Sequence, residues 1–269
     1  MKIKNLLSFV LLLITTAACG ATKSPVDLPV SATIPAATAT FTPVPPPTNP
    51  PMVEPLEVKS TPFSEEGKAP DYKITTQIPY LNSTDPSVQA YNAALKSIVD
   101  QAVATFKGTL TDMPATPILN GSTLDIQYQL IGQKGSIWSM QVNIMGFADG
   151  GAHPYHYSVS NNYDLKSGKA LTLDDLFLPN SNYLQTIADD CKAELSKRDI
   201  GFTDMFTQGA DPKPENYKNW NLSNEGFLVI TFDEDQIAPH AAGPQIVTIP
   251  FSELQSIQNP DGALGVFTK

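Results

Sequence analysis

Histidine and acidic residues in the middle of the chain are the side chains best suited to chemistry. Asp149, His153 and His156 lie close together in the sequence, and His240 is the third and last histidine. Zinc takes histidine and carboxylate ligands, so these four residues define one hypothesis, a metal site. Their spacing matches no established metal motif, and they fall across a loop and the start of a strand. We therefore expect no metal, and histidines that hydrogen-bond or pack.

Paired acids and tryptophans form a second possible chemistry, the binding or cleavage of sugars. Asp174-Asp175 and the run 233–235 place carboxylates together, as glycosidases require. Acids adjacent in sequence more often form solvated turns or helix starts, and Thr172 followed by Asp175 is typical of a capping box. Trp138 and Trp220 could stack on sugar rings, but isolated tryptophans are more often core or rim residues. We expect the structural roles for all of them.

No sequence motif identifies a nucleophile or a cofactor. The chain has no Gly-x-Ser-x-Gly elbow, no phosphate-binding glycine loop and no His-Glu-x-x-His. Cys191 lies on the apolar stripe of an expected helix, which favours a small buried core residue over a catalytic thiol. The sequence therefore predicts a protein that is not an enzyme and has no cofactor.

The N-terminus predicts export and lipid attachment. Lys2 and Lys4 precede an apolar run that is too short for a membrane-spanning helix, which is typical of a secretory signal peptide. Ala17 to Gly20 resembles the lipobox of bacterial lipoproteins, with Thr16 in place of the usual leucine. We expect cleavage after residue 18, acylation of Cys19 and an extracytoplasmic domain on a bacterial membrane. Cys191, the other cysteine, is then left without a disulfide partner.

Proline and charge define the next part of the chain and its surface. Half of the 24 prolines fall within the first 70 residues, which predicts an extended linker over residues 19–70, either a semi-rigid spacer or a plain tether. The formal net charge is −10 with no basic cluster, which argues against nucleic acid as a partner. Two further boundaries follow: a small α/β subdomain over residues 71–120 and an α+β domain over residues 121–269.

The hydrophobic pattern predicts an α+β fold, with antiparallel sheets covered by helices. Asp85 and Pro86 open a helix as its cap and first residue, and the Cys191 segment forms a second helix. Tight turns at 133–136 and 166–169 join successive strands. The expected strands span 72–81, 123–131, 137–147, 156–165, 170–173, 228–232 and 246–249.

Two stretches resemble a known family. The first runs from Gly150-Gly151-Ala152-His153 through residues 162–169 to 171–177, and the second covers residues 236–244 and 247–254. Together they resemble the extracytoplasmic domain of unknown function found in lysozyme-sensing anti-sigma factors and beside peptidoglycan deacetylase domains. The strand and helix of residues 72–107 resemble the smaller companion domain of that family.

The resemblance implies a binding module for a lysozyme-type protein or for peptidoglycan. The sequence contains neither the transmembrane helix nor the sigma-binding segment of the signalling members, nor a deacetylase domain, so we expect binding without catalysis. A cell-wall glycan hydrolase or deacetylase-like enzyme and a passive structural lipoprotein remain alternatives. The glycines at 150–151 serve either a turn or a ligand. The candidate ligand surface comprises Asp149, Gly150, Gly151, His153, His156 and His240.

Overall fold

The computed structural model describes residues 55–111, 121–201 and 203–269. The predicted signal peptide, Cys19 and the greater part of the predicted linker lie outside the described residues. The residues that follow Met52 form one compact unit, and the description below concerns that unit alone. None of its described helices has both the length and the apolar character that crossing a bilayer requires.

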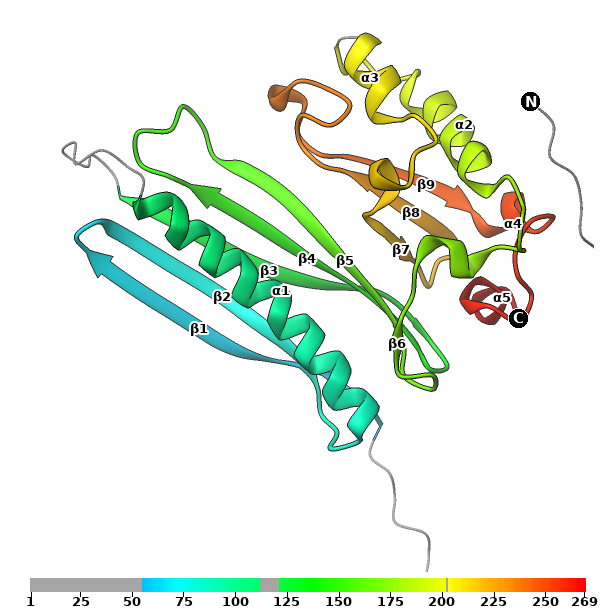
Figure 1. Ribbon diagram of the computed structural model, residues 1–269, viewed down its shortest axis with the longest axis horizontal. Coiled ribbons are helices and arrows are strands. Elements are labelled where there is room, and N and C mark those ends of the chain that lie inside the picture. Colours follow the sequence, from blue (N-terminus) through cyan, green and yellow to red (C-terminus); the bar gives the residue numbers. More distant parts are fainter. Residues whose placement is uncertain (1–54, 112–120, 202) are drawn as a thin grey trace, which may run out of the picture. The chain divides into compact units, whose positions relative to one another are not determined.

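A six-stranded sheet forms the first part of this unit (Figure 1). Its strands lie in sequence order, and every neighbouring pair is antiparallel except β2 and β3, which are parallel. The strands are β1 (Val58–Lys68), β2 (Asp71–Leu81), β3 (Ser122–Lys134), β4 (Ile137–Phe147), β5 (Tyr155–Asp164) and β6 (Lys169–Ala170). The α+β prediction of antiparallel strands and helices is thus confirmed, with one parallel pair that the sequence did not indicate.

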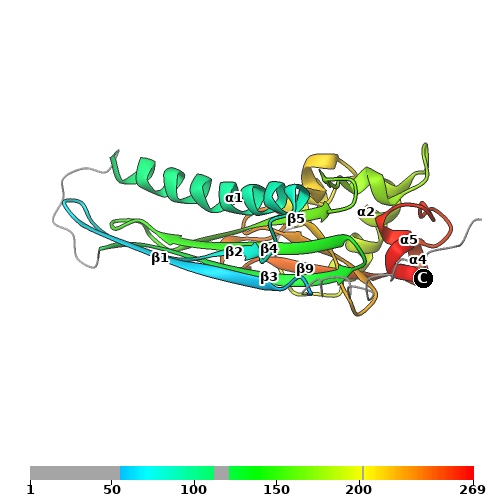
Figure 2. The same ribbon diagram turned by 90° about the horizontal axis from the view of Figure 1, so that it is seen from below.

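The long helix α1 (Pro86–Thr111) explains the parallel pair. Parallel neighbours need a crossover connection, and α1 with the residues that follow it joins β2 to β3. The predicted cap is present, because the Asp85 carboxylate accepts a hydrogen bond from the backbone N–H of Ser87 at 2.8 Å. Figure 2 shows α1 lying along one face of the sheet.

The contact between α1 and the sheet is an apolar core. Alternate residues of the strands, such as Ile126 on β3 and Val142 on β4, pack against residues at helical spacing on α1, such as Val99 and Phe106. Complete burial of a side chain such as Phe106 contributes on the order of 2 kcal/mol. Since this core occupies one face, the intervening side chains of β3, β4 and β5 point to the opposite face.

A three-stranded antiparallel sheet and several short helices make up the second part. Its strands are β7 (Trp220–Leu222), β8 (Phe227–Phe232) and β9 (Gln245–Pro250). The helices are α2 (Tyr183–Leu195), α3 (Thr203–Gly209), α4 (Phe251–Leu254) and α5 (Ala263–Thr268), with 3₁₀ turns η1 (Leu173–Leu176), η2 (Pro214–Tyr217) and η3 (His240–Ala242). Cys191 on α2 is completely buried in this core, and burial raises the pKa of its thiol to about 12. Its predicted role as a core residue is confirmed.

Buried polar side chains connect the two sheets. Asn221 on β7 is completely buried, and its side-chain amide donates hydrogen bonds to Ser139 Oγ at 3.0 Å and to the Met140 carbonyl at 3.2 Å. On the same interface Gln141 donates to Thr231 Oγ1 at 3.0 Å. Buried polar groups of this kind need partners at defined positions, so they fix how the two sheets meet.

Three local predictions differ from the structure. Val58–Lys68, which fell within the predicted linker, is strand β1 and pairs with β2 along its whole length, because its alternating residues suit a sheet edge that tolerates Pro62. The predicted boundary at residue 120 separates strands that share one sheet, since β2 pairs with β3. The predicted strand 170–173 is reduced to β6, because the Thr172–Asp175 turn begins η1.

Candidate functional site

The face of the six-stranded sheet opposite α1 carries a row of polar side chains. The register places Asp125 on β3 opposite Met145 on β4, and Met145 opposite His156 on β5. The next row joins Gln127, Asn143 and Ser158 in the same way. Residues directly opposite one another across neighbouring strands project to the same face, so these side chains form a continuous amide, hydroxyl and carboxylate surface.

A shallow cleft lies on this face, where β5 meets the loop before β9. Its volume is about 230 Å³. The residues that line it are Asp125, Gln127, Asn143, Ile144, Met145, His156, Tyr157, Ser158 and Pro244. The cleft therefore combines hydrogen-bond donors and acceptors on a sheet with one imidazole at its edge.

Glu234 holds His156 at the edge of this cleft. The Glu234 side chain is only 9% exposed, and it follows the end of β8. Its Oε2 accepts a hydrogen bond from the backbone N–H of His156 at 2.8 Å, and its Oε1 lies 2.8 Å from His156 Nδ1. A carboxylate only accepts hydrogen bonds, so His156 Nδ1 carries the proton. The ring is fixed in one orientation and in one tautomer.

The other two histidines join the same cluster. His240 Nδ1 lies 3.3 Å from Glu234 Oε2 and 3.4 Å from Asp235 Oδ2. The ring of His153 lies over the ring of His240, with centroids 3.7 Å apart and an interplanar angle of 31°. All three histidines of the chain are thus brought together around one buried carboxylate.

Asp233 binds the next outward-facing backbone group of β5. Its Oδ1 accepts a hydrogen bond from the backbone N–H of Ser158 at 2.9 Å, and its Oδ2 accepts one from Asn219 at 3.0 Å. Burial raises the pKa of Asp233, although these hydrogen bonds and nearby Lys218 act in the opposite direction. Together Asp233 and Glu234 satisfy the edge of β5, which would otherwise be free to pair with another strand.

The acids at 233–235 correct one prediction. They were expected to form a solvated turn or a helix start; the turn is present at residues 234–236, but Asp233 and Glu234 are mostly buried and only Asp235 is exposed. Their position directly after the apolar strand 227–232 was the available signal, since a residue there starts close to the sheet. Their partners on β5 could not be inferred because they lie 75 and 78 residues away in sequence.

The glycine turn beside His153 has a backbone role. Gly150 adopts a φ of 86°, which favours glycine, and the Gly151 N–H donates to the Ala148 carbonyl at 2.8 Å. The backbone N–H of Asp149 donates to Ser122 Oγ at 3.0 Å. The turn fixes where the chain enters β5, and whether it also contacts a ligand stays a prediction.

The arrangement resembles the orienting half of an acid–base pair. A histidine whose Nδ1 donates to a buried carboxylate has the geometry of an oriented general base. Within the described ranges, however, no serine, threonine or cysteine side chain hydrogen-bonds to a histidine ring. Nor do those ranges contain a group of three or more His, Cys, Asp or Glu side chains placed to hold a metal ion.

The other sugar-related candidates have structural positions. Trp138 and Trp220 are both 4% exposed, so the prediction of core residues is confirmed and neither indole offers a face to a sugar. The Asp175 carboxylate accepts hydrogen bonds from the backbone N–H and the hydroxyl of Thr172, both at 2.7 Å. The predicted capping box is therefore present.

The fold defines the class: an α+β domain with antiparallel-rich sheets, with a cleft on the open face of the larger sheet. Residues 174–252 match a family model described as "Protein of unknown function (DUF3298)", so this stretch carries a DUF3298 domain. A solved structure of a DUF3298 family member from Bacteroides fragilis has the same fold. It covers 80% of this chain and 98% of that chain, with a TM-score of 0.61 and 18% identity.

Two curated relatives share part of the sequence. Peptidoglycan-N-acetylmuramic acid deacetylase PdaC of Bacillus subtilis is 26% identical over 168 residues, which are 62% of this chain and 36% of PdaC. Immunogenic protein MPT64 of Mycobacterium tuberculosis is 30% identical over 108 residues, which are 40% of this chain and 46% of MPT64. The chain thus matches less than half the length of either relative.

Proposed function

We propose that this chain is a lipid-anchored, extracytoplasmic protein of the bacterial cell envelope whose domain binds cell-wall glycan without catalysis. The observation that carries the proposal is the polar cleft on the open sheet face. Sugar rings combine hydroxyl and acetamido groups with apolar C–H faces, and the cleft combines the polar groups of Gln127, Asn143, Asp125 and Ser158 with an apolar lining that includes Met145 and Pro244. The name of the related PdaC, a peptidoglycan deacetylase, is consistent with this ligand class.

The histidine cluster serves this binding site as a support. Glu234 fixes the His156 ring at the rim of the cleft, and the stacked pair of His153 and His240 holds the loop behind it. A preoriented side chain binds a ligand with less loss of conformational entropy.

Co-sedimentation with purified peptidoglycan sacculi tests the proposal. The full chain should sediment with sacculi, and the double variant Gln127→Ala/Asn143→Ala should bind about thirtyfold more weakly, because each lost hydrogen bond costs about 1 kcal/mol. Gln129→Ala is the matched control: it lies on the same strand and face, is exposed, and is outside the cleft. Absence of sedimentation, or equal losses in the cleft and control variants, would overturn the proposal.

A lysozyme-type protein is the alternative partner for the same surface, by resemblance to lysozyme-sensing domains. Calorimetry of the chain against lysozyme distinguishes the two partners. Binding to lysozyme with no binding to sacculi would replace glycan with protein as the ligand. Release of soluble fragments or acetate from sacculi, lost in His156→Ala, would instead favour the enzyme hypothesis.

The anchor is tested separately. Growth with an alkyne-labelled fatty acid should label the protein and place it in the membrane fraction, and Cys19→Ser should abolish both. Cys191→Ser is the matched control, since that thiol is buried in the core. Labelling that survives the Cys19→Ser change would contradict acylation at this residue.

A further inference from the structure

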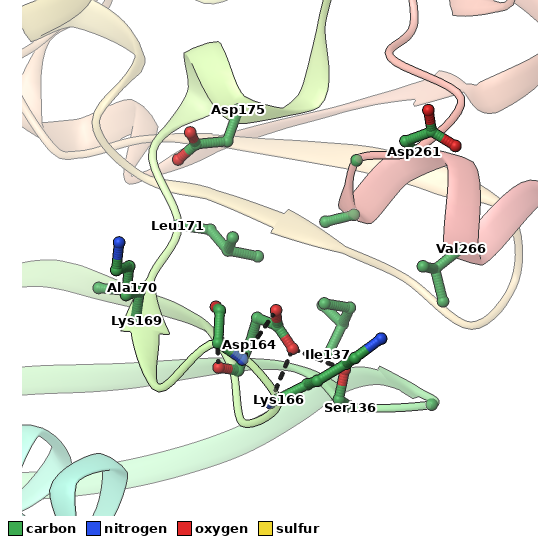
Figure 3. Close-up of a pocket in the computed structure, with 14 residues that line it drawn as sticks. Ser136, Ile137, Asp164, Lys166, Lys169, Ala170, Leu171, Asp175, Asp261 and Val266 are labelled. Atoms are coloured by element: carbon green, nitrogen blue, oxygen red, sulfur yellow. Dashed lines mark hydrogen bonds between the residues drawn. The ribbon is translucent and has the colours of Figure 1, made fainter. Parts of the chain in front are cut away.

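A second, larger cavity lies at the other end of β5, away from the histidines. Its volume is about 530 Å³, which is within the usual range for small-molecule sites. Three segments far apart in sequence enclose it: the tip of the β3–β4 hairpin, the residues from Asp164 to Leu171, and the start of α5, with Asp175 of η1 at its edge (Figure 3). The stretch 164–171 belongs to the family-like motif that the polar cleft leaves without a role.

The floor of this cavity is apolar. Ile137 and Ala263 are almost fully buried, and Leu171 and Val266 are partly buried. In Figure 3 the side chain of Leu171 lies between Asp175 and the Asp164–Lys166 turn, and Val266 faces the same space from α5. An apolar floor of this size suits an aliphatic segment of a ligand rather than a bare ion.

The rim carries opposite charges. Lys166 and Lys169 belong to the turn after β5, while Asp175 and Asp261 belong to the second part of the fold. Within the described part of the chain, neither lysine forms an ion pair, and the Asp261 carboxylate has none either. Residues of both charge signs therefore line a common cavity without forming ion pairs with one another.

The walls are held in place by hydrogen bonds that need no ligand. The Asp164 carboxylate accepts hydrogen bonds from Ser136 Oγ at 2.6 Å and from the backbone N–H of Lys166 at 3.0 Å. Lys134 Nζ donates to the carbonyl of Phe267 at 3.1 Å, which ties the hairpin to α5. The cavity is thus preformed, which lowers the cost of binding.

We propose that this cavity binds a short peptide that carries a free ammonium group and a free carboxylate. Lys166 or Lys169 would bind the carboxylate, Asp175 or Asp261 the ammonium, and the apolar floor the aliphatic part between them. A nucleotide or a fatty acid would place its anionic group beside Asp175 or Asp261 and would supply no cation for either acid. A cell-wall stem peptide has both charges, and naming it as the source rests on the proposed function above.

Calorimetry of the full chain with the synthetic peptide L-Ala-γ-D-Glu-L-Lys tests this. Binding should be saturable, and it should be lost with the same peptide after acetylation of its amines and amidation of its carboxylates. Lys166→Glu/Lys169→Glu should weaken binding about tenfold, and Asp261→Asn about threefold, since partly exposed ion pairs contribute less than about 1 kcal/mol each. Lys59→Glu, an exposed lysine on β1 outside the cavity, is the matched control.

The outcomes separate this inference from the proposed function. Each variant is first checked for an unchanged unfolding midpoint, because a misfolded variant would lose binding for another reason. No binding of the peptide by the original chain, or equal binding by the double lysine variant, overturns the inference. If the peptide does not bind but the chain still sediments with sacculi, the glycan proposal remains supported. If the peptide binds but the chain does not sediment with sacculi, only the glycan proposal is overturned.

Discussion

The two ends of β5 satisfy their backbone in different ways. At the Tyr155 end, carboxylates from a distant loop accept the backbone N–H groups of His156 and Ser158, across 78 and 75 residues of sequence. At the other end, Asp164 accepts the N–H groups of residues two and three positions ahead, Lys166 and Ser167. The first end is closed by tertiary structure and the second by a local turn.

This difference shows where each ligand surface gets its rigidity. The polar cleft depends on the loop after β8 being docked, because that loop brings Glu234 and Pro244 to β5. The charged cavity depends on a turn that forms from adjacent residues and is then bonded to the β3–β4 hairpin through Ser136. We therefore expect changes at the first end to affect global stability more than changes at the second.

Glu234→Ala should produce the largest loss of stability. It removes the acceptor of the His156 backbone N–H and the partner of two imidazoles, which should lower the free energy of unfolding by about 2 kcal/mol. Urea denaturation followed by circular dichroism measures this. Glu234→Gln, which keeps one acceptor, should lose less; equal stability of Glu234→Ala and the original chain would show that the docked loop contributes nothing.

Asp164→Ala should cost less, about 1 kcal/mol, because the turn keeps Gly168 and exposed N–H groups can bond to water. The same urea titration gives the value. Asp164→Asn retains an acceptor oxygen and serves as the control. A loss larger than that of Glu234→Ala would reverse the ranking of the two ends.

Lowering the pH should reduce the stability contributed by Asp164 at one end of β5 and increase that contributed by Asp233 at the other. Burial opposes ionisation of Asp164, but hydrogen bonds from Ser136, Ser167 and the turn backbone outweigh it and lower the pKa of Asp164. The stability that ionised Asp164 contributes is therefore present above the unfolded pKa of about 3.9, and it is lost as the pH falls through the lower folded pKa. Burial raises the pKa of Asp233, so its relative contribution is greatest at low pH and declines as the pH rises through the raised folded value.

Stability measured from pH 7 to pH 2.5 checks these signs through single substitutions. Asp164→Asn should reduce the loss of stability below about pH 4, and Asp233→Asn should remove a gain on acidification from neutral pH towards pH 4. The slopes, not the absolute stabilities, are compared, since each amide also changes a hydrogen bond. Identical slopes in both variants would contradict the assignment.

His153→Ala should have the smallest effect, below about 0.5 kcal/mol, because His153 is exposed and contributes a stacking contact at the surface. Thermal unfolding compares it with His240→Ala, which also removes contacts to Glu234 and Asp235. A larger loss for His153→Ala than for His240→Ala would mean that the stack, rather than the carboxylates, holds the loop.

The elements themselves were largely predictable. The predicted strand 137–147 coincides with β4, the cap at Asp85 opens α1, and residues 183–195 form α2. These features depend on periodicity and on contacts within a few residues. The strand β7 was missed because Trp220–Leu222 is too short for a periodic signal, and it is defined by its pairing with β8.

The candidate site was predictable only in part. His153, His156 and His240 were named from the sequence and expected to hydrogen-bond or pack, as they do. The metal hypothesis also needed Asp149, and no metal-ligating group occurs among the described residues. Glu234, the centre of the cluster, was assigned to a solvated turn. A carboxylate in a run of acids carries no local sign of burial, because its desolvation depends on which strand edge it meets.

The sequence alone determined the α+β class, the helices α1 and α2, the β3–β4 and β5–β6 turns, the capping box at Thr172 and the buried position of Cys191, since each follows from side chains that are neighbours along the chain or on one face of an element. The tertiary structure alone decided the parallel pairing of β2 with β3, the polar interface around Asn221, and the docking of Glu234 on His156. The physical reason is that contacts between distant segments depend on strand register and on the burial of polar groups. Those are properties of the assembled sheets rather than of any single stretch of residues.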